Sequence, residues 1–229
     1  IGMPIGMIML IVFSMQIAAT SVASEKEEKT LETLLTLPIN RFNILFGKLA
    51  GSVIVAAVGA LAYVLGFNYY MGSFTAAFPT QAGVDLAMLG LAPTLLSFLI
   101  LGASLFVTLV SALALAIVVS SFAEDVRSAQ TIVGYLYFLL FIPMLFMMYS
   151  DIGSLPMPLG IVLLAIPYTH PMLAARATFT GDYITAVLGI AYVSIFTVAI
   201  LYIAAKIFTT EKILTMKLRL RRPKPLREE

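Results

Sequence analysis

The residue types that most often carry out bond chemistry are scarce in this sequence. The chain of 229 residues has a single histidine and no cysteine, so disulfides and cysteine-ligated metals are excluded. His170 stands beside Pro171 without a second histidine or a paired carboxylate, and we interpret it as an interfacial polar residue. No glycine-rich ATP-binding loop is present. The long apolar runs contain no acidic residue, which argues against acid–base catalysis or proton-coupled transport within them. We therefore predict that the chain is not an enzyme and binds no metal and no cofactor of its own.

The longest charged interruption between Ile1 and Phe208 is the stretch from Ser24 to Lys48, and it is the candidate binding segment. Its carboxylates are Glu25, Glu27, Glu28 and Glu32. Ser24 and Glu27 have the Ser-x-x-Glu spacing of a capping box, which predicts that a helix begins at Ser24. Glu25 and Lys29 are spaced as a favourable ion pair on that helix. An apolar stripe covers another face of it: Leu31, Leu34 and Leu35.

A proline divides this segment into two helices. Pro38 disfavours helical backbone at the residue before it, and Asn40 can cap a second helix. Apolar residues at helical spacing then lead into the next apolar run: Phe42, Leu45, Phe46 and Leu49. Residues 24–48 are therefore predicted to form a helical hairpin whose second helix is an amphipathic ramp into a membrane.

Long apolar runs separate the charged residues. Hydrophobic residues make up 61% of the chain and charged residues 11%, whereas roughly a quarter of a soluble domain is charged. A helix needs about 20 apolar residues to cross a bilayer. Five runs meet this length: Ile1 to Ala23, Leu49 to Tyr70, Thr94 to Ser120, Thr131 to Tyr149 and Ala186 to Phe208. We predict an all-α, polytopic transmembrane bundle that forms a single domain over residues 1–229. Pro93 is expected to separate the third span from an interfacial piece before it.

Lysine and arginine predict the direction in which the chain crosses the membrane. They concentrate at residues 26–48, at Arg127 and at residues 206–227. Cytoplasmic loops are enriched in these residues, so we assign all three regions to the cytoplasm. With five spans the chain then begins outside and ends inside, as a multi-pass protein of the cell membrane with a cytoplasmic C-terminus. Because it opens inside an apolar run without a starting methionine, we expect its natural N-terminus to lie upstream.

Residues 156–182 are the ambiguous part of this topology. Their apolar core, residues 159–166, is too short to cross a bilayer, and Pro167 and Pro171 interrupt the residues after it. A sixth span would also place the basic tail outside. We predict an outer re-entrant or interfacial hairpin, whose irregular backbone must be covered by protein. The tail, residues 209–229, is predicted to be cytoplasmic and attracted to the headgroups of membrane lipid.

Two interpretations of residues 24–48 are compatible with this topology. An amphipathic hairpin can lie on lipid headgroups as an anchor. The polar face of this one is strongly acidic, however, and the cytoplasmic leaflet of a membrane is anionic. Repulsion between the two surfaces favours a protein as the partner of this segment.

Hydroxyl side chains follow one face of the third span: Thr94, Ser97, Ser104, Thr108 and Ser111. Such residues most often form hydrogen bonds between helices, and lining a polar path is the alternative. The fourth span is rich in tyrosine, phenylalanine and methionine, which suit lipid contact and core packing or a surface for greasy substrates. Gly47 and Gly51 form a G-x-x-x-G pattern that permits close approach of helices. Arg176 and Asp182 are expected to pair at the outer surface.

The order of an apolar span and then SEKEEKTLETLLTLPINRFNILFGKL resembles the permease subunits of ABC-2 type transporters. In that family the second membrane helix leads into a cytoplasmic segment of the form E-x-x-x-x-T-L-E-x-L-L-x-x-P-I. The matching positions are Glu25, Glu28, Thr30, Leu31, Glu32, Leu34, Leu35, Pro38 and the pair Gly47–Lys48. Residues 120–130, SSFAEDVRSAQ, are similar to the family's cytoplasmic turn, and residues 166–176, IPYTHPMLAAR, to its outer re-entrant hairpin.

This resemblance implies a set of partners. Family members usually have six spans, often with an extracellular domain after the first, so the chain is similar to their helices two to six. They act as homo- or heterodimers of permease subunits, and separate ATP-binding subunits hold the ATP and Mg²⁺. The segment that contacts those subunits would include Glu25, Glu27, Glu28, Thr30, Leu31, Glu32, Leu34, Leu35 and Pro38. No nucleic acid partner is expected.

The resemblance also implies a function, which is ATP-driven export by alternating access. The uncharged spans disfavour a highly charged substrate, so a hydrophobic or amphipathic one is expected, with a small cation such as sodium left open. The alternative from a different class is a membrane assembly or anchoring protein that transports nothing and docks a soluble partner on the same hairpin.

Overall fold

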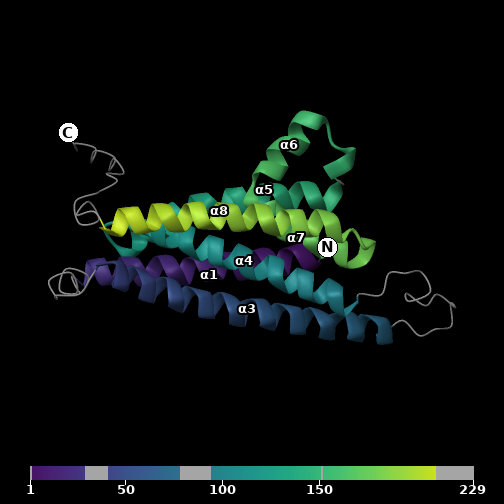
Figure 1. The fold of residues 1–229 in the computed structure, drawn as a ribbon, viewed down its shortest axis with the longest axis horizontal. Coiled ribbons are helices and arrows are strands. Elements are labelled where there is room, and N and C mark those ends of the chain that lie inside the picture. The colour runs from purple at the N-terminus through teal and green to yellow at the C-terminus, as the bar shows by residue number, and fades with distance from the viewer. Residues whose placement is uncertain (1, 29–40, 78–93, 151, 210–229) are drawn as a thin grey trace, which may run out of the picture.

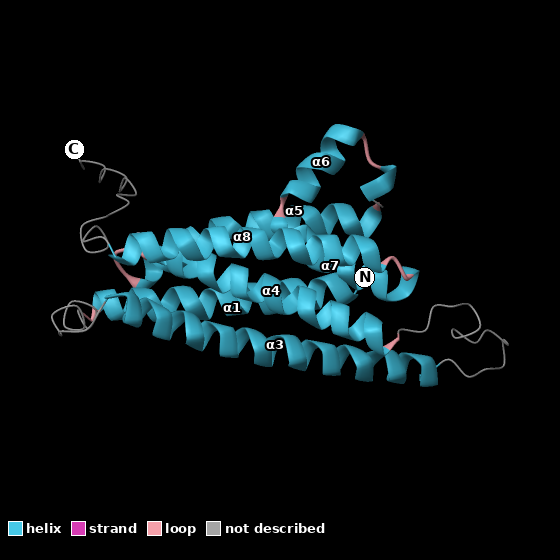
Figure 2. Cartoon of the chain, viewed as in Figure 1, coloured by secondary structure: helices cyan, strands magenta, loops and turns pink. Residues whose placement is uncertain are grey.

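The computed structural model describes residues 2–28, 41–77, 94–150 and 152–209, and every regular element in these ranges is a helix (Figure 2). The long helices are α1 (Gly2–Glu27), α3 (Arg41–Ala77), α4 (Leu95–Ser120), α5 (Val126–Tyr149) and α8 (Tyr183–Thr209). The short ones are η2 (Ile152–Ser154), α6 (Met157–Ala165), η3 (Pro167–Thr169) and α7 (His170–Thr180). The predicted all-α fold is confirmed over this part of the chain.

Each of the long helices contains a stretch that is long and apolar enough to cross a membrane. These stretches are Pro4–Glu27, Phe46–Ser73, Leu95–Ser120, Val126–Tyr149 and Tyr183–Ile207. Consecutive long helices run in opposite directions along the bundle (Figure 1), as successive membrane crossings must. The five predicted spans are therefore confirmed within the described residues. We call the end of the bundle at which α1 ends the Lys26 end, and the opposite end the Tyr183 end.

The prediction that a helix begins at Ser24 is wrong, because α1 continues through Ser24 to Glu27. The Ser24 hydroxyl donates to the carbonyl of Ser21 at 3.2 Å, a bond within the helix that replaces the predicted cap. The apolar run before Ser24 is already helical, and no residue there breaks the helix. The ramp predicted after Asn40 is continuous with the second span in α3, which starts at Arg41.

Two helix starts do carry capping boxes. At α4 the Thr94 hydroxyl accepts the backbone N–H of Ser97 at 3.2 Å, and the Ser97 hydroxyl accepts that of Thr94 at 3.3 Å. At α5 the Asp125 carboxylate accepts the backbone N–H of Ser128 at 2.6 Å. These caps satisfy donors that the first turn of a helix leaves without a partner. The cap at Asp125 makes α5 begin earlier than the apolar run from Thr131 to Tyr149 predicts.

The helix α4 lies at the centre of the bundle and contacts α1, α3, α5, α7 and α8. Leu101, Leu105 and Leu109 on α4 are completely buried, and they pack with Met7, Ile11 and Met15 of α1 among others. By contrast, only 11% of an 18-residue apolar stretch of α3 is buried. The helix α3 therefore lies at the edge of the bundle, with most of its surface facing outward.

The segment between α5 and α8 does not cross the bundle. The helix α5 ends and α8 begins at the Tyr183 end (Figure 1), and α6 meets the η3–α7 helix at an angle of 94°. The segment thus returns to the end from which it starts, which agrees with the predicted re-entrant hairpin. In Figure 1, α6 projects away from the long helices, while α7 lies against α8.

Candidate functional site

Lys26, in the last turn of α1, contacts the end of α4. Its Nζ atom donates to the carbonyl oxygens of Ser121 at 2.7 Å and Ala123 at 2.8 Å. The helix α4 ends at Ser120, and the carbonyls at a helix end need partners from outside the helix. The negative end of the helix dipole also attracts a cation. Lys26 therefore caps α4 from a position about 95 residues earlier in the chain.

The residues on either side of Lys26 contact two other helices. The Glu25 carboxylate lies 2.6 Å from the Lys48 ammonium group of α3. The Glu27 carboxylate accepts the backbone N–H of Val126, the first residue of α5, at 3.1 Å, where the dipole favours an anion. Three consecutive charged residues thus connect α1 to α3, α4 and α5. We call Glu25, Lys26 and Glu27 the charged end of α1.

The structure describes only some of the predicted partner-binding residues. Glu25 and Glu27 make the contacts above, and Glu28 is exposed next to them. The other predicted residues lie outside the described part: Thr30, Leu31, Glu32, Leu34, Leu35 and Pro38. Binding of a partner by this segment stays a prediction. Sequence reasoning missed Lys26 and the Lys48 pair, because their partners are distant in sequence and leave no local pattern.

The hydroxyl stripe of α4 faces the protein interior. Ser97, Ser104, Thr108 and Ser111 are no more than 1% exposed. Thr94 is exposed as the cap of α4. The Tyr183 hydroxyl of α8 lies 2.9 Å from that of Ser97 and 3.2 Å from that of Thr94. This end of the stripe therefore makes the interhelical hydrogen bonds that the sequence favoured.

The middle of the stripe is different. The Thr108 hydroxyl donates to the Ser104 carbonyl within α4 at 2.7 Å. The hydroxyls of Ser104, Ser111 and Tyr168 are buried without a hydrogen-bond partner among the described residues, although the Tyr168 hydroxyl lies beside Ser111. A buried polar group without a partner is costly. The alternative role of lining a path stays a prediction for all five residues of the stripe.

Three side chains form hydrogen bonds with backbone carbonyls where the helix of the hairpin is interrupted. At the end of α6 the backbone N–H of Ile166 donates to the Leu163 carbonyl at 3.1 Å, and side chains donate to this carbonyl and the two after it. The Thr169 hydroxyl donates to the Leu163 carbonyl at 2.6 Å, and Tyr192 of α8 donates to that of Ala165 at 2.7 Å. His170 Nε2 lies 3.1 Å from the Leu164 oxygen, and it must donate because a carbonyl only accepts. His170 is therefore a buried structural donor, and its position at the membrane interface stays a prediction.

Arg176 and Asp182 line one cavity of about 230 Å³ at the Tyr183 end. The Asp182 carboxylate accepts the backbone N–H of Thr185 at 3.3 Å. Hydrogen bonds from Thr185 hold the pKa of the Asp182 carboxyl below its usual value, so it is ionised at neutral pH. The two residues are neighbours, as expected, and their pairing stays a prediction.

The helices and contacts above define a polytopic membrane protein built around one central helix. In the described part of the chain, no group of three or more histidine or acidic side chains is placed to hold a metal ion. The family model described as ABC-2 family transporter protein matches residues 1–206. The chain therefore belongs to the ABC-2 transporter family, as a membrane component with a permease role. No curated protein and no solved structure shows a significant match to it.

Proposed function

We propose that this chain is the transmembrane subunit of an ATP-driven exporter. A separate ATP-binding subunit docks on residues 24–48 and supplies ATP and Mg²⁺, and a second permease subunit completes the translocation unit. Membership of the ABC-2 family supports this assignment, because permeases of this kind normally act with an ATP-binding subunit.

The charged end of α1 is the observation that carries the proposal. Residues 24–48 start in the last turn of α1 and end in the first turns of α3. Glu25, Lys26 and Glu27 hold that turn to α3, α4 and α5 by contacts of 2.6 to 3.1 Å. A partner that displaces the segment therefore acts on four spans together. This is the coupling that alternating access requires.

The exposed surfaces of the spans support the proposed class of substrate. Tyr135, Phe138 and Leu145 of α5 are each more than half exposed. No acidic or basic residue lies between Thr131 and Tyr149 on that helix. Aromatic and aliphatic surfaces of this kind suit a hydrophobic or amphipathic substrate.

The orientation of the bundle is also part of the proposal. Lys26, Lys48, Arg127 and Lys206 all lie in the terminal turns at the Lys26 end (Figure 1). An excess of basic residues marks the cytoplasmic side of a membrane protein. The Lys26 end is then cytoplasmic, where an ATP-binding subunit can reach it.

Co-purification of an ATP-binding protein tests the proposal. The variant to compare with the unmodified chain carries Glu28→Lys and Glu32→Lys, which reverse predicted docking charges without removing Glu25 or Glu27 from their contacts. We expect the unmodified chain to retain an ATP-binding protein from native membranes and the variant to lose it. The control is Asp182→Lys, which makes the same change of charge at the opposite end and should retain the partner. If the unmodified chain retains no ATP-binding protein, the proposed mechanism is wrong.

A further inference from the structure

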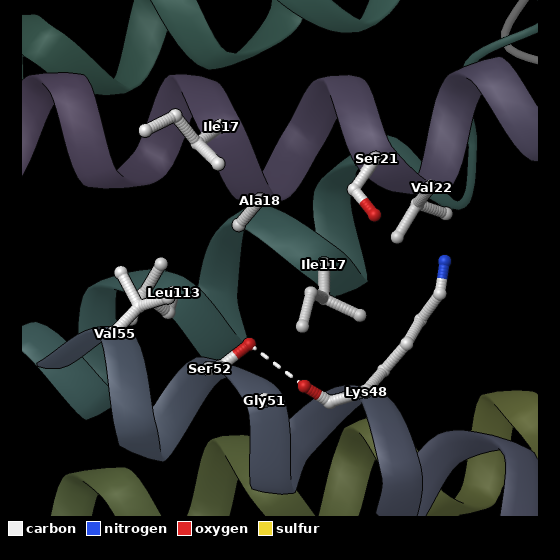
Figure 3. Close-up of a pocket in the computed structure, with 10 residues that line it drawn as sticks. All are labelled: Ile17, Ala18, Ser21, Val22, Lys48, Gly51, Ser52, Val55, Leu113 and Ile117. Atoms are coloured by element: carbon white, nitrogen blue, oxygen red, sulfur yellow. Dashed lines mark hydrogen bonds between the residues drawn. The ribbon is translucent and has the colours of Figure 1, made fainter.

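A groove runs between α1 and α3 on the outside of the bundle. Both helices pack on α4, and the gap between them leaves a cavity of about 270 Å³. We call it the α1–α3 groove. It is lined by Ile17, Ala18, Ser21 and Val22 of α1, Lys48, Gly51, Ser52 and Val55 of α3, and Leu113 and Ile117 of α4 (Figure 3).

The groove has one polar end and one apolar end. Figure 3 shows the Lys48 ammonium group and the Ser21 hydroxyl at the same end, and Ile17, Val55 and Leu113 at the other. Lys48 lies in the first turn of the apolar stretch of α3, which starts at Phe46. Val55 is seven residues further along the helix, about 10 Å deeper. The polar end is therefore at the level of the membrane surface, and the apolar end is in the hydrocarbon.

Both walls of the groove are exposed on the surface of the described bundle. Ile17 is 61% exposed and Val55 is 41% exposed. Gly51 contributes open space, because a Cβ atom added there would meet nothing within 4 Å. The lining of the groove is mostly aliphatic, which suits the acyl chain of a lipid. A single acyl chain is narrow enough to enter.

The charges at the polar end of the groove determine which lipid headgroup can bind there. The Lys48 ammonium group has three N–H donors, and one of them is directed at Glu25. Lys48 lines the groove and its side chain is 14% exposed, whereas Glu25 lies beside the groove, 2.6 Å from the Lys48 ammonium group, with its side chain 30% exposed. Opposite charges side by side match a lipid whose phosphate and ammonium groups are also side by side. A lipid with a net negative charge would instead be repelled by Glu25.

We propose that the α1–α3 groove binds a phospholipid with a phosphoethanolamine headgroup. The phosphate accepts from Lys48, the primary ammonium group lies beside Glu25, and one acyl chain lies along Gly51 towards Leu113. Such a lipid occupies the angle between the first two spans at the point where residues 24–48 leave the membrane. This inference does not depend on the proposed function, since no ATP-binding subunit takes part.

Lipid retention measures this binding directly. The purified full chain is incubated in detergent with equal amounts of dioleoyl phosphatidylethanolamine, phosphatidylcholine and phosphatidylglycerol, and the retained lipids are quantified by mass spectrometry. We expect phosphatidylethanolamine to be retained preferentially. Gly51→Leu should fill the groove and lower this retention about tenfold, equivalent to 1.4 kcal/mol.

Matched variants separate the groove from general effects on folding. Gly66→Leu makes the same substitution on the same helix, at another glycine with nothing within 4 Å, and should retain the lipid as the unmodified chain does. Glu25→Gln should shift the preference from phosphatidylethanolamine towards phosphatidylglycerol, because it removes the anion and leaves the Lys48 cation.

Three results would overturn the proposal. The first is equal retention by the unmodified chain and by Gly51→Leu, and the second is a preference of the unmodified chain for phosphatidylglycerol. The third is a change of oligomeric state in Gly51→Leu without a change in lipid retention, which would make the groove a contact between proteins.

Discussion

The ammonium group of Lys26 in α1 lies 2.7 Å from the carbonyl oxygen of Ser121, just beyond the end of α4. One side chain thereby fixes the end of an outer helix against the central helix of the bundle. The same turn of α1 also contacts α3 through Glu25 and α5 through Glu27. Four of the five long helices therefore meet at one turn, and removing any of these contacts should loosen that junction.

Replacing Lys26 by methionine should uncouple α1 from α4 while preserving the length of the side chain. Hydrogen bonds from a charged group contribute about 1.5–3 kcal/mol each, so we expect a clear fall in the midpoint of thermal unfolding in detergent. In a complex with an ATP-binding subunit, Lys26→Met should retain the partner but alter the rate of ATP hydrolysis. Arg127→Met removes an exposed basic residue at the same end and should leave both measurements unchanged. Unchanged stability and hydrolysis in Lys26→Met would show that the contact has no role.

The Glu25–Lys48 pair should stabilise the protein by about 1 kcal/mol. The side chains are 30% and 14% exposed, so solvent screens the pair only in part. A double-mutant cycle with Glu25→Gln, Lys48→Met and the double variant isolates this interaction. We expect the double variant to be more stable than the sum of the single changes predicts. Strict additivity would mean that the pair contributes nothing.

Thr169→Val should destabilise the re-entrant hairpin. The substitution removes the hydroxyl that donates to Leu163 at 2.6 Å and leaves a buried carbonyl with one hydrogen bond fewer. We expect a loss of about 1 kcal/mol, measured as increased proteolysis between α6 and α7 and a lower unfolding temperature. Thr180→Val is the matched control, because that hydroxyl is exposed and bonds only within α7. Equal behaviour of the two variants would contradict the role of Thr169.

Gly189→Ala should destabilise the contact between α8 and the hairpin. A Cβ atom at this position would lie 3.0 Å from Nδ1 and 3.1 Å from Cβ of His170, and the His170 ring is also held by Leu164 and packed against Tyr192. Overpacking of this kind costs about 1–3 kcal/mol. Gly134→Ala places the same methyl group in open space on α5 and should stabilise the helix by up to about 1 kcal/mol. A stabilised Gly189→Ala variant would show that His170 can move aside.

Two substitutions at Ser104 separate packing from transport. The Ser104 hydroxyl is buried without a partner in the described part of the chain, so Ser104→Ala should not lower the unfolding temperature. Ser104→Leu adds bulk to the stripe. If the stripe lines a path, that variant should lose substrate-stimulated ATP hydrolysis in the assembled complex while it still retains the ATP-binding subunit. Retained stimulation in a folded Ser104→Leu variant would exclude Ser104 from the path.

Much of the fold could be predicted from the sequence because membrane crossing depends on local properties. The lengths of the apolar runs and the absence of acidic residues in them predicted the five spans found in the described residues. Because Pro167 and Pro171 interrupt the segment, residues 156–182 were predicted not to form a sixth span. The capping-box pattern at Ser24 failed for a local reason as well: the residues before it were already helical, so no free helix start existed to be capped.

The sequence by itself thus determined the class of protein, the five spans of the described residues and the charged segment that follows the first of them. These depend on short windows of residues, whose hydropathy and charge act without distant partners. Only the tertiary structure decided what Lys26, Lys48 and His170 do. Lys26 contacts residues about 95 positions away, Lys48 pairs with a residue of another helix, and Gly189 of α8 packs against His170 of the hairpin. Such contacts depend on how helices pack together, and sequence periodicity says which face of a helix is apolar without saying which helix will cover it.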